Sequence, residues 1–243
     1  MQEKVYHTSF EQEEKYWWYI GRNVIIRSFL EKFCKLEKGS TVLDIGCGTG
    51  GFAASISQKY IPFCLDTSQI ALEYCKKRGI KNVFNSTIED FELPDSKINA
   101  LTLLDVIEHI ENDFSVIKNA HRILDERGWL IVTVPAYSWL WSKHDELVMH
   151  ERRYARKQLS DLLKSAGFQV EYSSYFNFFL FLPAVLKRFY NEHFVKEVDL
   201  ESVEKVPEFL NKVFKNIFAF ESKILQKIKL PFGLSIIAIA RKI

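Results

Sequence analysis

The stretch VLDIGCGTGGF, residues 42–52, decides the fold. Its first residues are typical of a short buried strand, and Gly46, Gly48 and Gly50 follow that strand directly. Glycine tolerates left-handed backbone conformations and lets a ligand approach the main chain closely. The residues after Gly50 can open a helix, so the stretch predicts a strand, a tight turn and a helix whose N-terminus faces a ligand.

Strand and helix patterns alternate on both sides of this stretch, with short connections between them. Strands are expected at 41–45, 62–66, 81–86, 99–105, 129–135, 169–175 and 233–242. Helices are expected at 15–33, 51–60, 68–79, 113–128 and 156–168. This alternation predicts an α/β fold, a doubly wound Rossmann-like and mostly parallel sheet with helices on both faces. Ligands of such sheets bind at the carboxyl ends of the strands.

The domain organisation has four expected parts along the 243 residues. They are an N-terminal helical cap at 1–38, an α/β core at 39–174, a helical insertion at 175–232 and a final core strand at 233–243. The insertion is expected because its length far exceeds that of ordinary loops. Its many phenylalanines leave four interpretations open: a substrate cap, a membrane contact, a dimer seam or an ordinary packed subdomain.

Composition narrows the class of partner. The 33 Lys and Arg nearly balance the 31 Asp and Glu, so no basic field indicates a nucleic-acid partner. The four cysteines lack the spacing of a zinc site. The N-terminus does not read as an export signal and no apolar run is long enough to span a bilayer, so a cytoplasmic location is expected. Peripheral membrane contact through 175–230 stays open, and no oligomeric state is predicted.

The glycine spacing argues against one class of cofactor. It is GxGxG, whereas the dinucleotide fingerprint is GxGxxG. Asp44 lies two residues before Gly46, where a carboxylate would repel a pyrophosphate but suit a cationic amino-acid ligand. Asp66 ends the second strand, a position suited to a ribose diol. An NAD-dependent oxidoreductase is therefore the disfavoured alternative.

Four motifs in order, LDIGCGTG, CLDTSQIALEYCKKRG, TLLDVIEHI and RILDERGWLIVTVP, carry a family resemblance. Over about residues 15–175, the chain resembles class I S-adenosylmethionine-dependent methyltransferases. The resemblance implies S-adenosyl-L-methionine as methyl donor and S-adenosyl-L-homocysteine as product, an activity in class EC 2.1.1. It implies a small-molecule or lipid- or glycan-type acceptor, with O-methylation favoured. A non-catalytic scaffold that binds the cofactor is a second alternative.

The resemblance also assigns cofactor contacts. The methionine part of the cofactor would be contacted by residues of the glycine turn and of two strand ends, Asp44, Gly46, Gly48, Gly50 and Asp105. Those to the ribose and adenine would come from Asp66, Thr67, Thr87 and Ile88. Thr87 stands where many relatives carry an acid for the adenine amino group. The N-terminal YWWYIGR resembles a cofactor-covering helix, in which Arg22 would pair with the cofactor carboxylate and Trp18 would cover the site; the alternative is that the tryptophans only pack on the domain.

The acceptor side is expected near two other segments. His109, just after the fourth strand, is a candidate general base or a helix-capping residue. The run of Asp105, Glu108 and His109 is similar to one in quinone-biosynthesis O-methyltransferases that suggests a divalent metal, but one such turn is weak evidence and no metal ligand is predicted.

The second segment, WLWSKHDELVMHERRY at 139–154, leaves the same sheet edge. It resembles a bacterial methyltransferase branch with W-S-x-H-D…H-x-R-R-Y. His144 is a second catalytic candidate, and the acceptor contacts are expected from Trp18, Tyr137, His150, Arg152, Arg153 and Tyr154. The alternative is that HERRY ties the loop to the domain by ion pairs.

Overall fold

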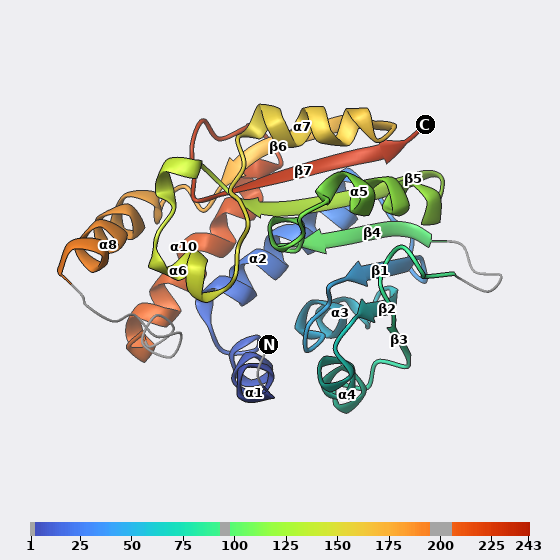
Figure 1. The fold of residues 1–243 in the computed structure, drawn as a ribbon, viewed down its shortest axis with the longest axis horizontal. Coiled ribbons are helices and arrows are strands. Elements are labelled where there is room, and N and C mark those ends of the chain that lie inside the picture. Colours follow the sequence, from blue (N-terminus) through green and yellow to red (C-terminus); the bar gives the residue numbers. More distant parts are fainter. Residues whose placement is uncertain (1–2, 93–97, 195–205) are drawn as a thin grey trace.

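A seven-stranded sheet forms the centre of the protein (Figure 1). The computed structural model describes residues 3–92, 98–194 and 206–243. The strands are β1 Thr41–Ile45, β2 Ile61–Asp66, β3 Asn82–Asn85, β4 Ile98–Leu104, β5 Leu124–Pro135, β6 Phe168–Phe176 and β7 Ser235–Lys242. Their order is β3-β2-β1-β4-β5-β7-β6, with β7 antiparallel to both neighbours and the other pairs parallel. The predicted α/β, mostly parallel sheet is confirmed.

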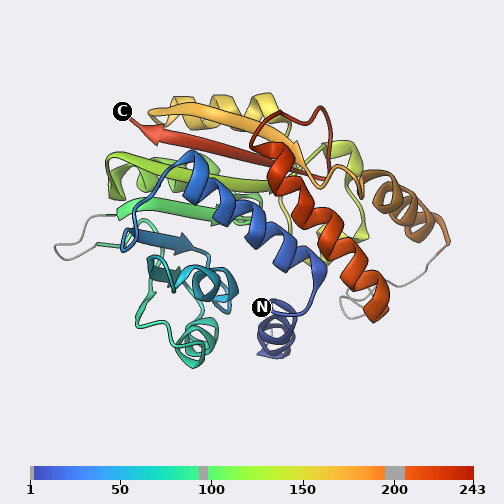
Figure 2. The same ribbon diagram turned by 180° about the vertical axis from the view of Figure 1, so that it is seen from behind.

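Helices cover both faces of the sheet. They are α1 Glu3–Gln12, α2 Trp17–Ser28, α3 Gly51–Ile56, α4 Gln69–Lys77, α5 Asp113–Ile123, α6 Lys143–Leu147, α7 Arg156–Ser165, α8 Phe181–Phe194 and α10 Glu208–Leu225. Helices α5 and α7 lie on one face (Figure 1), and α2 and α10 lie side by side on the other (Figure 2). None of the described helices is both long and apolar enough to cross a bilayer.

Two expected helices differ from the structure. The helix expected at 113–128 ends at Ile123, because Leu124 pairs with Ile98 and the chain from there already belongs to β5. The helix expected at 15–33 continues from α2 into a π-helical turn, Phe29–Phe33. Helix α1 lies within the expected helical cap at 1–38, but no separate helix is predicted at its residues. Its sequence lacks a strong apolar stripe, and α1 instead packs against α4.

The segment expected as an insertion does not form a separate layer. Its helix α10 packs along α2, the helix of the expected N-terminal cap. Gly21 makes this close approach possible, since a Cβ atom there would lie 2.3 Å from Cδ1 of Phe218. At the start of the segment, Glu221 of α10 accepts backbone N–H bonds from Asn177, Phe178 and Phe179 at 2.7–3.2 Å. Helix α2 of the cap and helix α10 of the insertion thus form one helical layer over the sheet.

The core divides between the two faces of the sheet. Neighbouring residues of β1 point alternately to the two faces of the sheet. Leu43 belongs to the hydrophobic cluster beneath α5 and α7, and Val42 belongs to the cluster beneath α2 and α10. A parallel sheet covered on both faces needs apolar residues at successive positions. Residues 42–45, just before the glycines, are therefore apolar apart from Asp44, and that exception lies at the site described next.

Candidate active site

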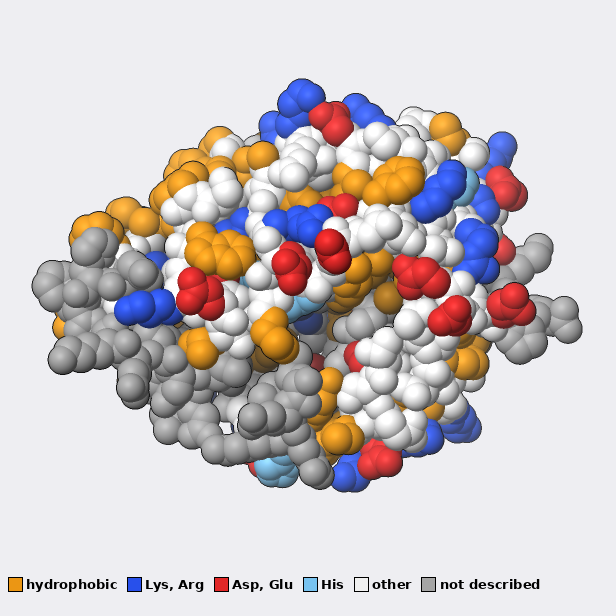
Figure 3. Space-filling view, viewed as in Figure 1, with side chains coloured by type: hydrophobic (Ala, Val, Ile, Leu, Met, Phe, Trp, Pro, Cys, Tyr) orange, Lys and Arg blue, Asp and Glu red, His pale blue; other side chains and the backbone are white. Residues whose placement is uncertain are grey.

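The molecular surface is hollowed beyond the carboxyl ends of β1 and β4 (Figure 3). The glycine turn borders this edge, with φ of 64° at Gly46, 54° at Gly48 and 80° at Gly50. A Cβ atom at Gly46 would lie 2.7 Å from the Val106 side chain. At Gly48 the nearest heavy atom to such a Cβ is Glu13 Oε1, at 3.7 Å. The main chain at Gly48 therefore remains open to a ligand, as the glycine pattern predicts.

Asp66 is fixed at the end of β2 against the glycine turn. Its Oδ2 accepts the Gly48 N–H at 2.9 Å, and its Oδ1 accepts the Ser68 N–H at 2.9 Å. Burial raises the pKa of this carboxyl, while the two backbone bonds favour the ionised form. Each carboxylate oxygen has a second lone pair, so this geometry suits a vicinal diol, the ligand group expected at this position.

Two further acids end neighbouring strands. Asp44 of β1 is buried and accepts a 2.6 Å hydrogen bond from Thr102 Oγ1, and burial raises its pKa to about 7. Asp105, directly after β4, has a left-handed backbone with φ of 58°. It accepts Arg22 Nη1 at 2.7 Å and Thr133 Oγ1 at 3.1 Å. The carboxyl ends of β1, β2 and β4 thus each present a carboxylate.

Arg22 was expected to pair with a cofactor carboxylate, and the structure gives it a partner within the chain. Besides Asp105 it donates to the Leu104 carbonyl at 3.3 Å, and its guanidinium lies 4.6 Å from the Trp18 ring centroid. Its buried Nε has no hydrogen-bond partner among the described residues. This nitrogen is closed off from the surface, so the contact of Arg22 with a cofactor carboxylate stays a prediction. Trp18 lies beside it as a cover.

Glu13 is a site residue that the sequence did not reveal. It follows α1 and reaches across the glycine turn, where its Oε2 accepts Thr49 Oγ1 at 2.5 Å and the Gly51 N–H at 2.8 Å. Arg78 Nη2 lies 3.2 Å from the same oxygen. Burial raises the pKa of Glu13. In sequence it belongs to the acidic run EQEEK, which resembles a solvated helix face, so no signal distinguished it.

The expected adenine side lies beyond β2 and β3. Thr67 and Thr87 are exposed, and Ile88 is buried with its carbonyl accepting Arg122 Nη2 at 3.2 Å. Thr87 donates its hydroxyl to Asp90 at 2.9 Å. That bond brings an acid next to the position where relatives carry one. The adenine contacts of Thr67, Thr87 and Ile88 stay predictions.

The loop after β5 closes on a buried carboxylate. Asp145 receives Arg153 Nε at 2.8 Å, Arg153 Nη2 at 3.1 Å and His150 Nδ1 at 2.8 Å. Burial alone would raise the pKa of Asp145, but the His150 hydrogen bond and the Arg153 charge hold that pKa well below its usual range. The loop ends are joined as well, since Tyr154 N–H donates to the Pro135 carbonyl at 3.0 Å.

Three of the residues expected to contact the acceptor are engaged in holding this loop. Arg153 is buried and also donates to the Ala136 carbonyl at 2.9 Å. Tyr154 is fully buried and donates to Asp113 at 2.7 Å, and burial raises its pKa. Arg152 donates to the Glu111 carbonyl at 2.8 Å. For Arg153 and Tyr154 the structure favours the alternative in which HERRY ties the loop to the domain.

The remaining expected residues are His109, His144, His150 and Tyr137. His109 places Nδ1 3.2 Å from the Met149 carbonyl, and its ring centroid lies 4.7 Å from that of His150. Burial and the neighbouring His150 lower the pKa of His109. Burial lowers the pKa of His144 to about 4. Tyr137 stacks on Tyr175 at 5.0 Å. The structure therefore unites His109 and His150, from segments that are 41 residues apart.

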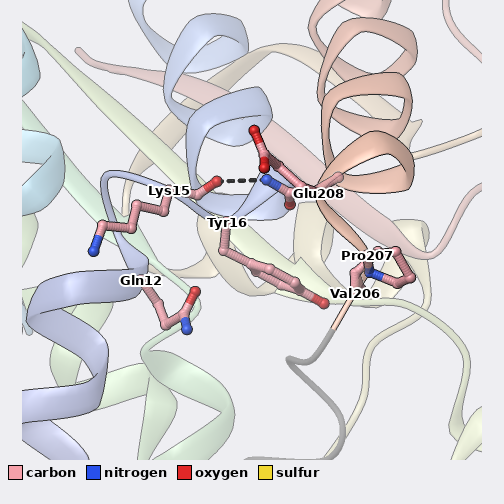
Figure 4. Close-up of a pocket in the computed structure, with 7 residues that line it drawn as sticks. Gln12, Lys15, Tyr16, Val206, Pro207 and Glu208 are labelled. Carbon is pink, nitrogen blue, oxygen red and sulfur yellow. Dashed lines mark hydrogen bonds between the residues drawn. The ribbon is translucent and has the colours of Figure 1, made fainter.

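A second hollow lies at the junction of α1, α2 and α10 (Figure 4). Asn211 spans this junction, donating to the Lys15 carbonyl at 2.8 Å and accepting the Trp17 N–H at 2.8 Å. The lining residues are Gln12, Lys15, Tyr16, Val206, Pro207, Glu208 and Asn211. None of them is a predicted site residue. The Asn211 contacts connect α10 to the segment that carries Glu13 over the glycine turn.

The sheet order and the acid-lined glycine turn at its carboxyl edge define the class I methyltransferase fold. The chain belongs to the methyltransferase domain family, whose model matches residues 17–173.

Individual relatives agree with this assignment. The chain is 26% identical over 164 residues to a probable S-adenosylmethionine-dependent methyltransferase of Mycolicibacterium smegmatis, covering 65% of this chain and 62% of that one. It is 33% identical over 98 residues to the ubiquinone biosynthesis O-methyltransferase of Rickettsia conorii, covering 38% and 34%. The matches thus span less than two thirds of either relative.

A solved structure matches over nearly the whole chain. It is a SAM-dependent methyltransferase of Thermotoga maritima, described as a possible histamine N-methyltransferase. The TM-score is 0.58 at 22% identity, with 93% of each chain covered. At this identity the likeness is one of fold. It covers the C-terminal helical segment as well as the sheet.

Proposed function

We propose that this protein binds S-adenosyl-L-methionine at the glycine turn and transfers its methyl group to a hydroxyl-bearing acceptor. The bound cofactor would supply a methyl group already activated on a sulfonium. The residues of this chain would hold the cofactor, orient the acceptor for in-line attack and keep water out. Family membership supports the class of reaction.

The observation that carries the cofactor assignment is the set of carboxylates at the ends of β1, β2 and β4. Asp66, held by two backbone N–H groups, would accept the ribose hydroxyls. Asp44 would attract the α-ammonium of the methionine part, and the guanidinium of Arg22 would pair with its carboxylate. A pyrophosphate would be repelled by Asp44 at the same turn. These charges therefore support the methyl donor over a nicotinamide dinucleotide.

The acceptor would approach from the loop after β5. His109, at the end of β4, and the partly buried His144 carry imidazoles whose lowered pKa values favour the neutral form at neutral pH. A neutral imidazole can accept a proton from a hydroxyl, so both stay candidates for the base. O-methylation is favoured by the likeness to the ubiquinone biosynthesis O-methyltransferase. Tyr137 and Arg152, which are both partly exposed, are proposed acceptor contacts.

A hydrophobic or lipid-linked acceptor is supported by exposed apolar side chains in the C-terminal helical segment. Leu182 and Leu186, four residues apart on α8, are 64% and 60% exposed, and Phe209 of α10 is 75% exposed. Hydrophobic side chains gather over α8 in Figure 3. Flotation with anionic liposomes tests peripheral contact. Binding that Leu182→Ser and Leu186→Ser abolish would support it, and no flotation together with turnover of small soluble acceptors would exclude it.

The proposed activity is tested by screening a metabolite extract with methyl-tritiated cofactor. Wild-type protein should transfer label to at least one extract component, and Asp66→Ala at equal concentration should transfer far less. Binding of adenosylhomocysteine without transfer to any acceptor would indicate the scaffold alternative. Intact-complex mass spectrometry that finds NAD instead of adenosylhomocysteine would indicate an oxidoreductase.

A further inference from the structure

Glu108 is a buried acid without a hydrogen bond. Its side chain is fully buried in the turn after β4, and neither carboxylate oxygen has a hydrogen-bond partner among the described residues. An unpaired buried carboxylate is costly, so such a group is protonated, paired or bound to a cation. A bound cation would therefore stabilise the ionised Glu108 carboxylate in this buried position.

Two imidazoles lie next to this carboxylate. His150 Nε2 is 3.9 Å from Glu108 Oε1, and the three nearest donor atoms of Glu108, His109 and His150 all lie within 4.8 Å of one another. Two donors that each bind a metal at about 2.1 Å can be at most about 4.2 Å apart. The Glu108–His150 pair already meets this limit. His109 is exposed, so its ring can close any remaining gap.

Both imidazoles have the outer hydrogen bonds that metal ligands require. The Nδ1 of His150 is bonded to Asp145 Oδ1 at 2.8 Å, which leaves Nε2 directed to Glu108. The Nδ1 of His109 lies 3.2 Å from the Met149 carbonyl. A ligating histidine typically donates its other ring N–H to a carboxylate or a backbone carbonyl, which fixes the tautomer. The buried Asp145–Arg153 pair thus holds His150 in a ligating orientation.

We propose that Glu108, His109 and His150 form a binding site for a divalent first-row transition metal. Two imidazoles and one carboxylate are a donor set that suits such ions, in preference to magnesium or calcium, which favour oxygen ligands. Asp105 is not part of the set, because it lies outside this cluster of donor atoms and its Oδ2 already accepts hydrogen bonds from Arg22 and Thr133. The third donor comes instead from the loop after β5. Glu108 and His109 are adjacent in the sequence, and only the fold brings His150 to them.

Three protein donors leave coordination positions for water or for an oxygen of a bound acceptor. A metal there would lower the pKa of a coordinated hydroxyl, and His109 would then act as ligand and not as base. This role toward an acceptor rests on the proposed function. Metal binding itself does not, and it can be measured without cofactor or acceptor.

The test is titration of chelator-treated protein with Co²⁺, followed by d–d absorption and by calorimetry, with Zn²⁺ and Mn²⁺ as further probes. Wild type should bind one Co²⁺ per chain. His150→Ala and the isosteric Glu108→Gln should each weaken binding by at least tenfold. His144→Ala is the matched control from the same loop, and it should bind as wild type does. Thermal unfolding in EDTA checks that each variant is folded.

A second cluster of possible metal ligands, made of three cysteines, is the alternative site for the ion. The thiols of Cys47, Cys64 and Cys75 are buried, and their Sγ atoms also lie within 4.8 Å of one another. Cobalt held by these thiolates would show intense sulfur-to-metal charge-transfer bands and would be lost in Cys75→Ser. Such a spectrum, equal affinity in folded Glu108→Gln, or the absence of one-to-one binding of all three ions would each overturn the proposal.

Discussion

Arg153→Ala should destabilise the protein rather than weaken acceptor binding specifically. The side chain is 1% exposed and makes three N–H bonds, two to Asp145 and one to the Ala136 carbonyl. Removing one partner of a buried ion pair leaves an uncompensated charge and costs roughly 3–5 kcal/mol. Asp145 would keep His150 and Ser142, with Arg188 Nη1 at 3.5 Å. Because these partners remain, we expect Arg153→Ala to lower the free energy of unfolding by about 3 kcal/mol, the lower end of that range.

Urea denaturation measures this loss directly. For a chain of this size the corresponding fall in Tm is roughly 6–12 °C. Arg152→Ala is the matched control from the adjacent position, where the partly exposed side chain pairs with Asp113, and it should cost less than about 1 kcal/mol. If Arg153→Ala were as stable as the control while the KM for an acceptor rose, the assignment of Arg153 to the loop tie would be refuted.

Three other results are expected. Burial raises the pKa of Asp44 to about 7, so its carboxylate becomes protonated as the pH falls through 7. Calorimetry should therefore show that adenosylhomocysteine binds about tenfold more weakly at pH 6 than at pH 8. The Asp44→Asn variant should bind weakly at both pH values. Burial also raises the pKa of Glu221 to about 7 against an unfolded value near 4.3, so the native state binds more protons and wild type loses stability as pH rises between about 4 and 7. Urea denaturation should therefore show the stability of Glu221→Gln relative to wild type increasing from pH 5 to pH 8 by roughly 2–3 kcal/mol, and a constant difference would contradict this sign. Gly21→Ala should cost about 1–3 kcal/mol in the same assay, since its Cβ atom would lie 2.3 Å from Phe218; an unchanged midpoint would show that α2 and α10 can move apart freely.

The sheet was predictable because its signals are local. The strand before the glycine turn and most of those after it are short runs rich in apolar residues, and such runs indicate a doubly wound sheet without knowledge of distant contacts. The boundary between α5 and β5 was not predictable. Residues 124–128 extend a helical pattern in sequence, and only their pairing beside Ile98 makes them a strand.

The cofactor side was more predictable than the acceptor side for a physical reason. Asp44 and Asp66 follow strands directly, so the sheet alone places them at one edge. Glu13 contacts the glycine turn from a distant segment, and Asp145 meets Arg153 only because the loop between them folds back, and no periodicity indicates either contact. The HERRY motif suggested both a substrate clamp and a loop tie, and the burial of Arg153 is a tertiary property that decides between them.

The central claim, a methyl-donor site at the glycine turn, is tested most directly by calorimetric titration of adenosylhomocysteine into wild type and Asp66→Ala. Loss of a charged acceptor for the ribose hydroxyls should weaken binding by about 2–3 kcal/mol, on the order of 30- to 150-fold. Thermal unfolding of the free proteins checks that the variant is folded. Equal affinity in the two proteins, or binding of NAD in place of adenosylhomocysteine, would contradict the claim.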